Sequence, residues 1–220
     1  EGQVKKVIGG HWVWSPAMQR LAEEEKIEAY ILPGGVSSQL LREIGAGRPG
    51  LFTHVGLGTV CDPRQGGGRM NTSAKDDLAE VVQMDGLEYL RYKPFPVHVA
   101  IVRASSADED GNISFEHEAA NLDAQSLALA ARNSGGKVIV QVKERLRHGA
   151  LKAREVRIPA AWVDAIVVDP SQQTSYDIPF DPALSGELSG DARRSSELAD
   201  QDAEKASALE TFSERQAVAK

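Results

Sequence analysis

A glycine-rich segment with two arginines is the part of this sequence whose residue types best suit ligand binding. It runs from Gly56 to Asn71 and reads GLGTVCDPRQGGGRMN. Glycines let backbone N–H groups approach an anion or a carbonyl oxygen, and a guanidinium matches phosphate or carboxylate in two-point contact. The same composition also suits a flexible connector with two solvated arginines. The segment has neither the Gly-Lys-Ser/Thr ending of a P-loop nor the spacing of a dinucleotide fingerprint, so both interpretations stay open.

A second candidate segment follows an apolar run and ends in a turn. Residues 106–112 read SADEDGN, and the Asp110-Gly111 pair is a strong turn signal. Ligands of α/β sheets gather at the carboxyl ends of strands, which would let Asn112 face a binding site. The competing interpretation is that this segment is only a turn.

No complete catalytic or metal-binding set can be assembled from the sequence. Residues 116–118 read Glu-His-Glu, but side chains two positions apart diverge on a helix, so we expect no metal site there. There is no Gly-x-Ser-x-Gly nucleophile motif. Cys61 precedes Asp62, whose carboxylate should disfavour the thiolate, and we treat this thiol as incidental. His98 lies within an apolar run and is expected to be a buried core histidine.

Composition limits the partners and the compartment. The 220 residues carry 25 Lys and Arg against 32 Asp and Glu, a net charge of −7, and no basic stripe, which argues against nucleic acid. No apolar run approaches the roughly 20 residues of a membrane helix, so no membrane partner is expected. The single cysteine excludes an internal disulfide and a cysteine-rich zinc cluster, and it fits a reducing, cytoplasmic compartment.

The elements that must position these residues alternate between strands and helices. The expected strands are residues 6–8, 27–32, 51–55, 87–92 (as an edge strand), 97–102, 138–142 and 165–168. The expected helices are one that starts at Pro16 behind an N-cap at Ser15, one over 37–46 and an Ala-rich one over 114–133. This order predicts an α/β fold with an open, largely parallel sheet and flanking helices.

Several short stretches can be taken together in order: residues 32–36, 46–51, 56–59, 62–64, 67–68, 107–108, 111–113, 118–119, 133–139, 141–142, 158–159 and 163–164. As a set they resemble family I coenzyme A transferases, most of all the single-chain acetate or propionate CoA-transferase type. No single motif decides the matter, but their order and spacing together are specific. The resemblance covers roughly residues 1–187.

The resemblance implies an exchange of CoA between a short-chain acyl-CoA and a free carboxylate such as acetate. In such enzymes a glutamate attacks the thioester and forms a glutamyl-CoA intermediate, while backbone N–H groups stabilise the oxyanions. It also implies the fold shared with sugar-phosphate isomerases, no cofactor besides the CoA substrates, a second CoA-transferase half or subunit, and a homo-oligomer. The residues placed near the CoA or acyl group are Gly34, Gly35, Gly56, Gly58, Thr59, Arg64 and Asn112.

The chain departs from the family pattern at three points. The nucleophilic glutamate, which the family carries before Asn-Gly or Ser-Gly, has no match, since Glu187 and Glu210 are followed by other residues. A Gly-Gly-Phe segment near the family's N-terminus is absent, and Gly34 stands where the family carries a glutamine. We therefore expect residues 1–187 to be a first half-domain without its N-terminal segment, and 188–220 a linker and the start of the second half. The nucleophile would lie outside this chain, which would be inactive alone.

Two other functions stay open. The missing glutamate and Gly34 would also suit a catalytically inactive CoA-binding or assembly module. A sugar-phosphate isomerase or deaminase on the same fold would need a carboxylate base and a phosphate loop within this chain, and no such base can be assigned.

Overall fold

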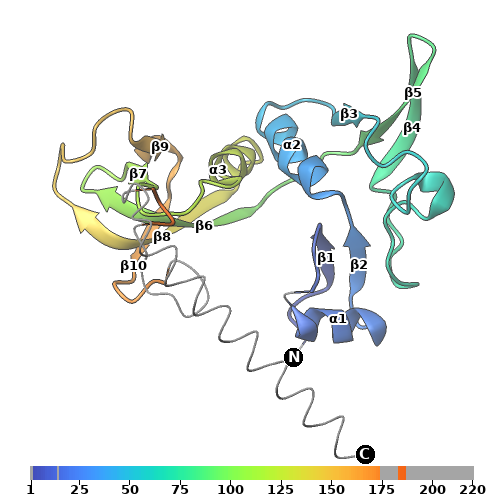
Figure 1. Cartoon of the computed structure of the whole chain (residues 1–220), viewed down its shortest axis with the longest axis horizontal. Coiled ribbons are helices and arrows are strands. Elements are labelled where there is room, and N and C mark those ends of the chain that lie inside the picture. The colour runs from blue at the N-terminus through green and yellow to red at the C-terminus, as the bar shows by residue number, and fades with distance from the viewer. Residues whose placement is uncertain (1, 14, 174–182, 187–220) are drawn as a thin grey trace, which may run out of the picture. The chain divides into compact units, whose positions relative to one another are not determined.

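The computed structural model describes residues 2–13, 15–173 and 183–186, and it has the expected α/β class (Figure 1). The chain divides into two units. One consists of residues 1–115 and 121–170 and contains every helix and strand named below. The other combines residues 116–120 with 171–220, and within its described part the Gln172 side-chain amide donates to Glu118 over 3.2 Å.

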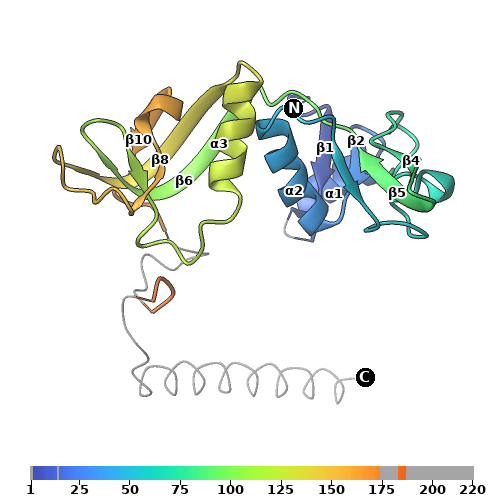
Figure 2. The same ribbon diagram turned by 90° about the horizontal axis from the view of Figure 1, so that it is seen from above.

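A five-stranded mixed sheet forms the larger part of the first unit. Its order is β10 (Ala165–Val168), β8 (Lys137–Leu146), β6 (Val99–Asp108), β7 (Ile113–Ser114) and β9 (Val156–Ile158). The first three strands are parallel, whereas β7 and β9 pair antiparallel. Helix α3 (Ala124–Asn133) connects β6 to β8 and lies along one face of these strands (Figure 2).

Strands β1 and β2 form a parallel pair, and the other two helices, α1 and α2, adjoin these strands in the chain. Strand β1 (Lys6–Gly9) pairs with β2 (Glu28–Ile31), and α1 (Pro16–Glu23) connects them. Ser15 stands at the expected N-cap of α1, although its side chain makes no capping hydrogen bond. Helix α2 (Gly34–Gly45) starts directly behind Pro33, three residues before the expected start. Its first turn therefore contains Gly34 and Gly35, which the sequence prediction leaves outside the helix.

A three-stranded antiparallel sheet follows, in the order β3 (Leu51–Thr53), β5 (Leu87–Tyr92) and β4 (Ala79–Met84). The sequence prediction of β5 as an edge strand was wrong, because it overlooked β4. The connection of β4 to β5 is Asp85-Gly86, with φ of 51° and 78°. Positive φ at both positions is what a tight two-residue hairpin requires.

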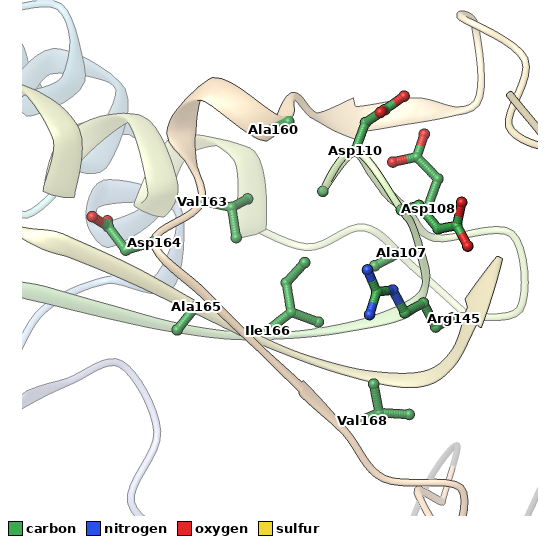
Figure 3. A pocket seen from close by; sticks show the side chains of 12 residues that line it. Ala107, Asp108, Asp110, Arg145, Ala160, Val163, Asp164, Ala165, Ile166 and Val168 are labelled. Carbon is green, nitrogen blue, oxygen red and sulfur yellow. The ribbon is translucent and has the colours of Figure 1, made fainter. Parts of the chain in front are cut away.

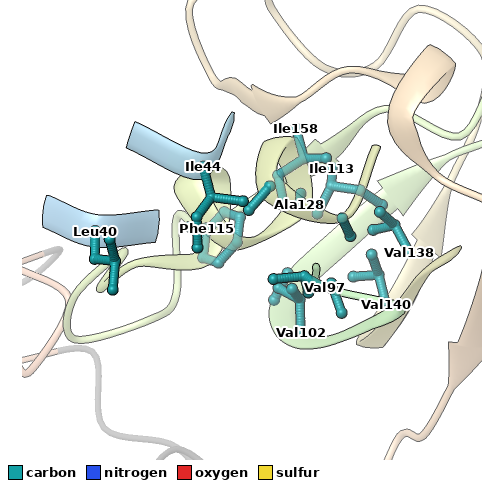
Figure 4. Packing of buried hydrophobic residues seen from close by; sticks show 14 of the residues in the cluster. Leu40, Ile44, Val97, Val102, Ile113, Phe115, Ala128, Val138, Val140 and Ile158 are labelled. Atoms are coloured by element: carbon teal, nitrogen blue, oxygen red, sulfur yellow. The ribbon is translucent and has the colours of Figure 1, made fainter. Parts of the chain in front are cut away.

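The core lies between α3, α2 and one face of the five-stranded sheet (Figure 4). On β8, Val138, Val140 and Val142 are fully buried, and each such side chain contributes roughly 1.5–3 kcal/mol through burial. Alternate positions of β6 and β8 point to this core, which is the two-residue period of a strand.

The helix expected over residues 114–133 is shorter in the structure. Ile113 and Ser114 form β7, because both side chains are buried and pair with the end of β6. Only the Ala-rich part, from Ala124, is helical. The histidine prediction was also wrong: His98 is exposed and lies before β6 rather than in the core.

Candidate functional site

The glycine-rich segment is an ordered loop folded around the carboxylate of Asp62. This side chain is 1% exposed. It accepts hydrogen bonds from the Gly58 N–H (2.9 Å) and the Arg64 N–H (3.0 Å), and it caps a short 3-10 turn, η1 (Pro63–Gln65). An Asp that bonds the backbone two residues ahead is a turn-forming device, so the Asp-Pro-Arg sequence carried the signal for this role.

Arg64 is bound within the protein rather than left free for a ligand. Its guanidinium donates to both Asp62 oxygens, over 3.0 and 2.8 Å, and to both Glu88 oxygens on β5 over 3.2 Å. The Arg64 guanidinium, followed by the Gly58 N–H, holds the pKa of Asp62 well below its usual range. The two carboxylates in turn raise the pKa of Arg64. Loop shape is therefore the role that the geometry supports for Arg64.

Gly56 and Tyr92 fix the start of the loop. Gly56 has φ of 104°, a conformation that side chains rarely adopt, and a Cβ there would lie 2.2 Å from the Tyr92 hydroxyl. That hydroxyl donates to the Val55 carbonyl over 2.9 Å, and burial raises the pKa of Tyr92 to about 12. Thr59 is exposed, but its hydroxyl also bonds within the loop, since it donates to the Gly56 carbonyl over 2.8 Å.

The end of the loop is fastened by the Asn71 side chain. Its amide donates to the carbonyls of Ala22 (2.9 Å) and Ile27 (2.8 Å), and its oxygen accepts from the N–H groups of Ala29 and Ala74, both at 3.2 Å. The side chain that sequence analysis placed in the candidate ligand loop thus joins α1 and β2 to the residues after the loop.

Glu25 supplies a further anchor and makes part of the stability depend on pH. Its carboxylate accepts from the N–H groups of Ser73 (2.7 Å) and Thr72 (3.0 Å). Hydrogen bonding by the Ser73 side chain, followed by that of the Thr72 N–H, lowers the pKa of Glu25 to about 2. Because the pKa is lowered on folding, the Glu25 carboxylate contributes fully to the free energy of unfolding above its unfolded pKa of about 4.5. This contribution is lost as the pH falls toward 2.

We expect Glu25→Gln to lower the free energy of unfolding at pH 7, with the difference from the unmodified chain shrinking between pH 5 and pH 2. Urea unfolding at several pH values measures this. The matched control is Glu23→Gln, which removes an exposed carboxyl from the same helix end. If the free energy of unfolding lost in Glu25→Gln stayed constant down to pH 2, the role of the ionised Glu25 carboxylate as an anchor would be contradicted.

Cys61, in the glycine-rich loop, is buried. Its thiol is 4% exposed and lies 3.5 Å from the Ile31 carbonyl. Burial raises the pKa of the Cys61 thiol. The expected unreactive thiol therefore agrees with the structure, but the cause is burial rather than the neighbouring carboxylate.

Gly34 and Gly35 form the exposed first turn of α2. A Cβ at either position would meet nothing within 4 Å, so both border open space. Among the described residues their backbone N–H groups have no acceptor, as is usual for the first turn of a helix. Such N–H groups carry partial positive charge and can bind an anion or a polarised carbonyl oxygen.

Asn112 serves the turn after β6. Its side-chain N–H donates to Asp108 over 2.9 Å, and its oxygen accepts from the Ala160 N–H over 3.1 Å. Burial raises the pKa of Asp108, but hydrogen bonds from Asn112, Asp110 and Gly111 together outweigh it, and the net shift is downward. These contacts of Asn112 agree with the interpretation of residues 106–112 as a turn.

A hollow of about 290 Å³ lies at the carboxyl ends of β6 and β8 and along β10 (Figure 3). Ala107, Ile166 and Val168 give it an apolar wall, and Arg145, Asp108 and Asp110 give it polar groups. At its rim His148 Nδ1 lies 2.7 Å from Asp110, whose carboxylate raises the pKa of the histidine. Sequence analysis missed this hollow, because its lining comes from strands far apart in the chain.

The structure brings the glycine-rich loop close to Gly34 and Gly35, but it does not bring Asn112 to them through any described contact. The loop packs on the end of β2, since the Ile31 N–H donates to the Gly68 carbonyl over 2.7 Å, and α2 with Gly34 and Gly35 begins just beyond that strand. The contacts given above for Asn112 are instead made within the five-stranded sheet and its connections.

The described residues supply donors and shape rather than a nucleophile. The exposed N–H groups of α2 could stabilise negative charge on an oxygen, and the loop beside them is held rigid by its own hydrogen bonds. Within residues 2–13, 15–173 and 183–186, no helix has the length and apolar character needed to cross a membrane.

The sequence matches one family model over most of its length. Residues 1–169 match the family described as coenzyme A transferase. The acetate CoA-transferase YdiF of Escherichia coli K12 is 42% identical over 192 residues, which cover 87% of this chain and 36% of that protein. The caffeate CoA-transferase of Acetobacterium woodii is 44% identical over 191 residues, 86% of this chain and 36% of that protein.

Solved structures of CoA-transferases are also similar to this chain. An acyl-CoA transferase of Escherichia coli O157:H7, solved as a thioester complex with CoA, superposes with a TM-score of 0.82 at 42% identity, covering 86% of this chain and 39% of that one. Glutaconate CoA-transferase of Acidaminococcus fermentans shares the fold, with a TM-score of 0.61 at 20% identity over 76% of this chain and 55% of its own. The chain thus spans little more than a third of the curated relatives first matched, at 36% of each.

Proposed function

Because the chain belongs to the coenzyme A transferase family, we propose that it forms part of an enzyme that moves CoA from a short-chain acyl-CoA to a free carboxylate such as acetate. The observation that carries this proposal is the 42% identity to an acetate CoA-transferase over 87% of the chain. Since the chain spans 36% of that relative, the proposal concerns the whole enzyme of which this chain would be the first part.

The proposed reaction runs through a glutamate outside this chain. Its carboxylate attacks the thioester carbonyl and expels CoA thiolate, which gives an acyl-glutamyl anhydride. The thiolate then attacks the glutamyl carbonyl, releases the acyl carboxylate and leaves a glutamyl-CoA thioester. The contribution of this chain would be the N–H groups at Gly34 and Gly35, presented beside the loop that carries Gly56, Gly58 and Thr59.

The remaining parts of the proposal concern assembly. Residues 1–187 would be the first half-domain without its N-terminal segment, and 188–220, which lie outside the described residues, the linker and start of the second half. A second half or subunit would complete the site in a homo-oligomer. We propose a cytoplasmic location, supported by a single buried cysteine. CoA and acyl-CoA would act as substrates, with no further cofactor.

The test is exchange between acetyl-CoA and short carboxylates by the full-length polypeptide, with this chain alone as control. We expect CoA transfer by the full-length protein and none by the isolated chain. Acyl-CoA without acceptor should also make the full-length protein sensitive to borohydride, which reduces a glutamyl-CoA thioester. Absence of both results in a folded full-length protein would refute the proposal.

An inactive CoA-binding module is the second candidate, and the residue at position 34 favours it. Gly34 stands where the family resemblance places a glutamine near the thioester, and the open space there would admit the larger side chain. Gly34→Gln in the full-length protein should then raise the exchange rate from near zero, whereas Gly35→Gln should not. CoA-analogue binding without exchange in every variant would support the inactive module.

A further inference from the structure

The hollow at the ends of β6 and β8 combines an apolar wall with a charged side chain that has no partner. Its apolar wall consists of Ala107, Val163, Ile166 and Val168. Arg145 of β8 lies beside Ala107 of β6 in the strand register, and Figure 3 shows its guanidinium among these lining side chains. Within the part of the chain that the structure describes, Arg145 makes no hydrogen bond and no ion pair. The hollow therefore presents one unpaired positive charge next to hydrocarbon.

The carboxylates of the turn between β6 and β7 also line the hollow, but other groups already bind them. Asp108 accepts hydrogen bonds from the backbone N–H (2.8 Å) and the side chain (2.9 Å) of Asn112. Asp110 lies 2.7 Å from His148 Nδ1, and Glu109 accepts from the His148 backbone N–H over 3.2 Å. None of these three carboxylates forms an ion pair with the arginine of the hollow.

The fourth lining carboxylate, that of Asp164 before β10, is likewise engaged. It accepts from the Val138 N–H over 2.8 Å and lies 3.0 Å from Lys137 Nζ and 3.5 Å from the Arg132 guanidinium. Two cations of the protein thus balance its charge. Of the charged side chains that line the hollow, Arg145 alone has no partner in the described chain.

The chemistry of this lining matches an anion that carries a short hydrocarbon chain. A guanidinium binds a carboxylate through two parallel hydrogen bonds, and apolar side chains remove a bound alkyl group from water. The volume of about 290 Å³ limits the ligand to a small molecule. The neighbouring carboxylates of residues 108–110 repel a doubly charged phosphate more than a singly charged carboxylate, which favours the carboxylate.

We infer that this hollow is a binding site for a short aliphatic carboxylate. Arg145 binds its carboxylate group, and Ile166 and Val168 contact its hydrocarbon chain. The carboxyl ends of parallel strands are the usual place for ligands in α/β sheets, and β6 and β8 are parallel. The inference goes beyond the proposed function, since no residue of the glycine-rich loop or of the start of α2 lines the hollow.

Methyl NMR of the 220-residue chain tests the inference, and its outcome does not depend on CoA transfer. The isoleucine methyl groups are isotopically labelled, and sodium butyrate is titrated into the sample. Ile166 reports on the hollow, whereas Ile44, a core residue of α2 that is 7% exposed, is the internal reference. Butyramide, which has a similar shape but no charge, is the matched control for the ligand.

Two arginine variants provide the matched control for the protein. Arg145→Gln and Arg147→Gln each remove one exposed guanidinium from the same segment, but only Arg145 lines the hollow. Urea unfolding first shows that both variants are folded. We expect butyrate to shift the Ile166 methyl resonance and butyramide not to shift it. Arg145→Gln should weaken butyrate binding at least about tenfold, and Arg147→Gln less than about twofold. Acetate, which has two methylene groups fewer, should bind roughly tenfold more weakly than butyrate.

An Ile166 methyl resonance that butyrate leaves unchanged, or that butyramide shifts equally, would overturn the inference. Equal weakening by the two arginine variants would also overturn it, because it would show a diffuse attraction of the basic segment instead of a site. Binding and CoA transfer are measured separately, so either result would leave the proposed function standing.

Discussion

Gly56→Ala should destabilise the protein by about 3–5 kcal/mol, because it combines an unfavourable backbone conformation with overpacking. The backbone has φ of 104°, and the new Cβ would meet the Tyr92 hydroxyl at 2.2 Å and a Leu90 methyl at 3.0 Å. Tyr92 and Leu90 are both fully buried, so neither can move aside cheaply. Urea unfolding of the variant and the unmodified chain measures the difference.

The same loop offers a control with the strain but not the clash. Gly58 has φ of 70°, and a Cβ at this position would meet nothing within 4 Å, so Gly58→Ala should cost only about 1 kcal/mol. Adding Tyr92→Phe to Gly56→Ala should recover part of the loss, since it removes the oxygen that clashes. A Gly56→Ala cost no larger than that of Gly58→Ala would show that the loop adapts and that Tyr92 does not hold it.

Asn71→Ala should cost about 3–4 kcal/mol, since it leaves several backbone groups without their partners. The Ala29 N–H belongs to a fully buried residue, and it would lose its acceptor together with the Ala74 N–H, while the carbonyls of Ala22 and Ile27 would lose their donors. The measurement is again the free energy of unfolding in urea.

The control for this change is a second asparagine on the surface. Asn121 is exposed and contributes only its backbone carbonyl to a described hydrogen bond, so Asn121→Ala should stay within about 0.5 kcal/mol. Asn71→Asp should fall between the two, because it keeps the acceptor oxygens and loses both donors. Equal costs for the two alanine variants would exclude Asn71 as the anchor of the loop.

The regular elements could be predicted where periodicity and turn residues agreed. The strand expected at 165–168 has those bounds in the structure, and Pro16 does begin a helix. The errors share one cause, which is pairing between distant residues. Strand β7 has two residues and forms by pairing with the end of β6 on one side and with β9 on the other. Strand β4 makes β5 a central strand through a tight turn that the sequence prediction missed.

The contacts of the candidate site also depend on pairing between distant residues, which the sequence prediction could not supply. Residue types correctly marked 56–71 as an unusual segment, but types alone could not tell whether Arg64 faces a ligand or Asp62 and Glu88. That distinction needs the neighbouring strand β5, which contributes Glu88 from 24 residues further along the chain. The open surroundings of Gly34 and Gly35 likewise depend on where α2 starts.

The carboxylate at the centre of the glycine-rich loop has a consequence for binding thermodynamics. A loop with this many glycines has a large conformational entropy when unfolded, and a ligand that had to order it would bind weakly. Here Asp62 orders the loop during folding, through the Gly58 and Arg64 N–H groups and the Arg64 guanidinium. Any ligand that meets this surface therefore finds it already shaped, and the free energy of its contacts goes into affinity rather than into ordering the chain.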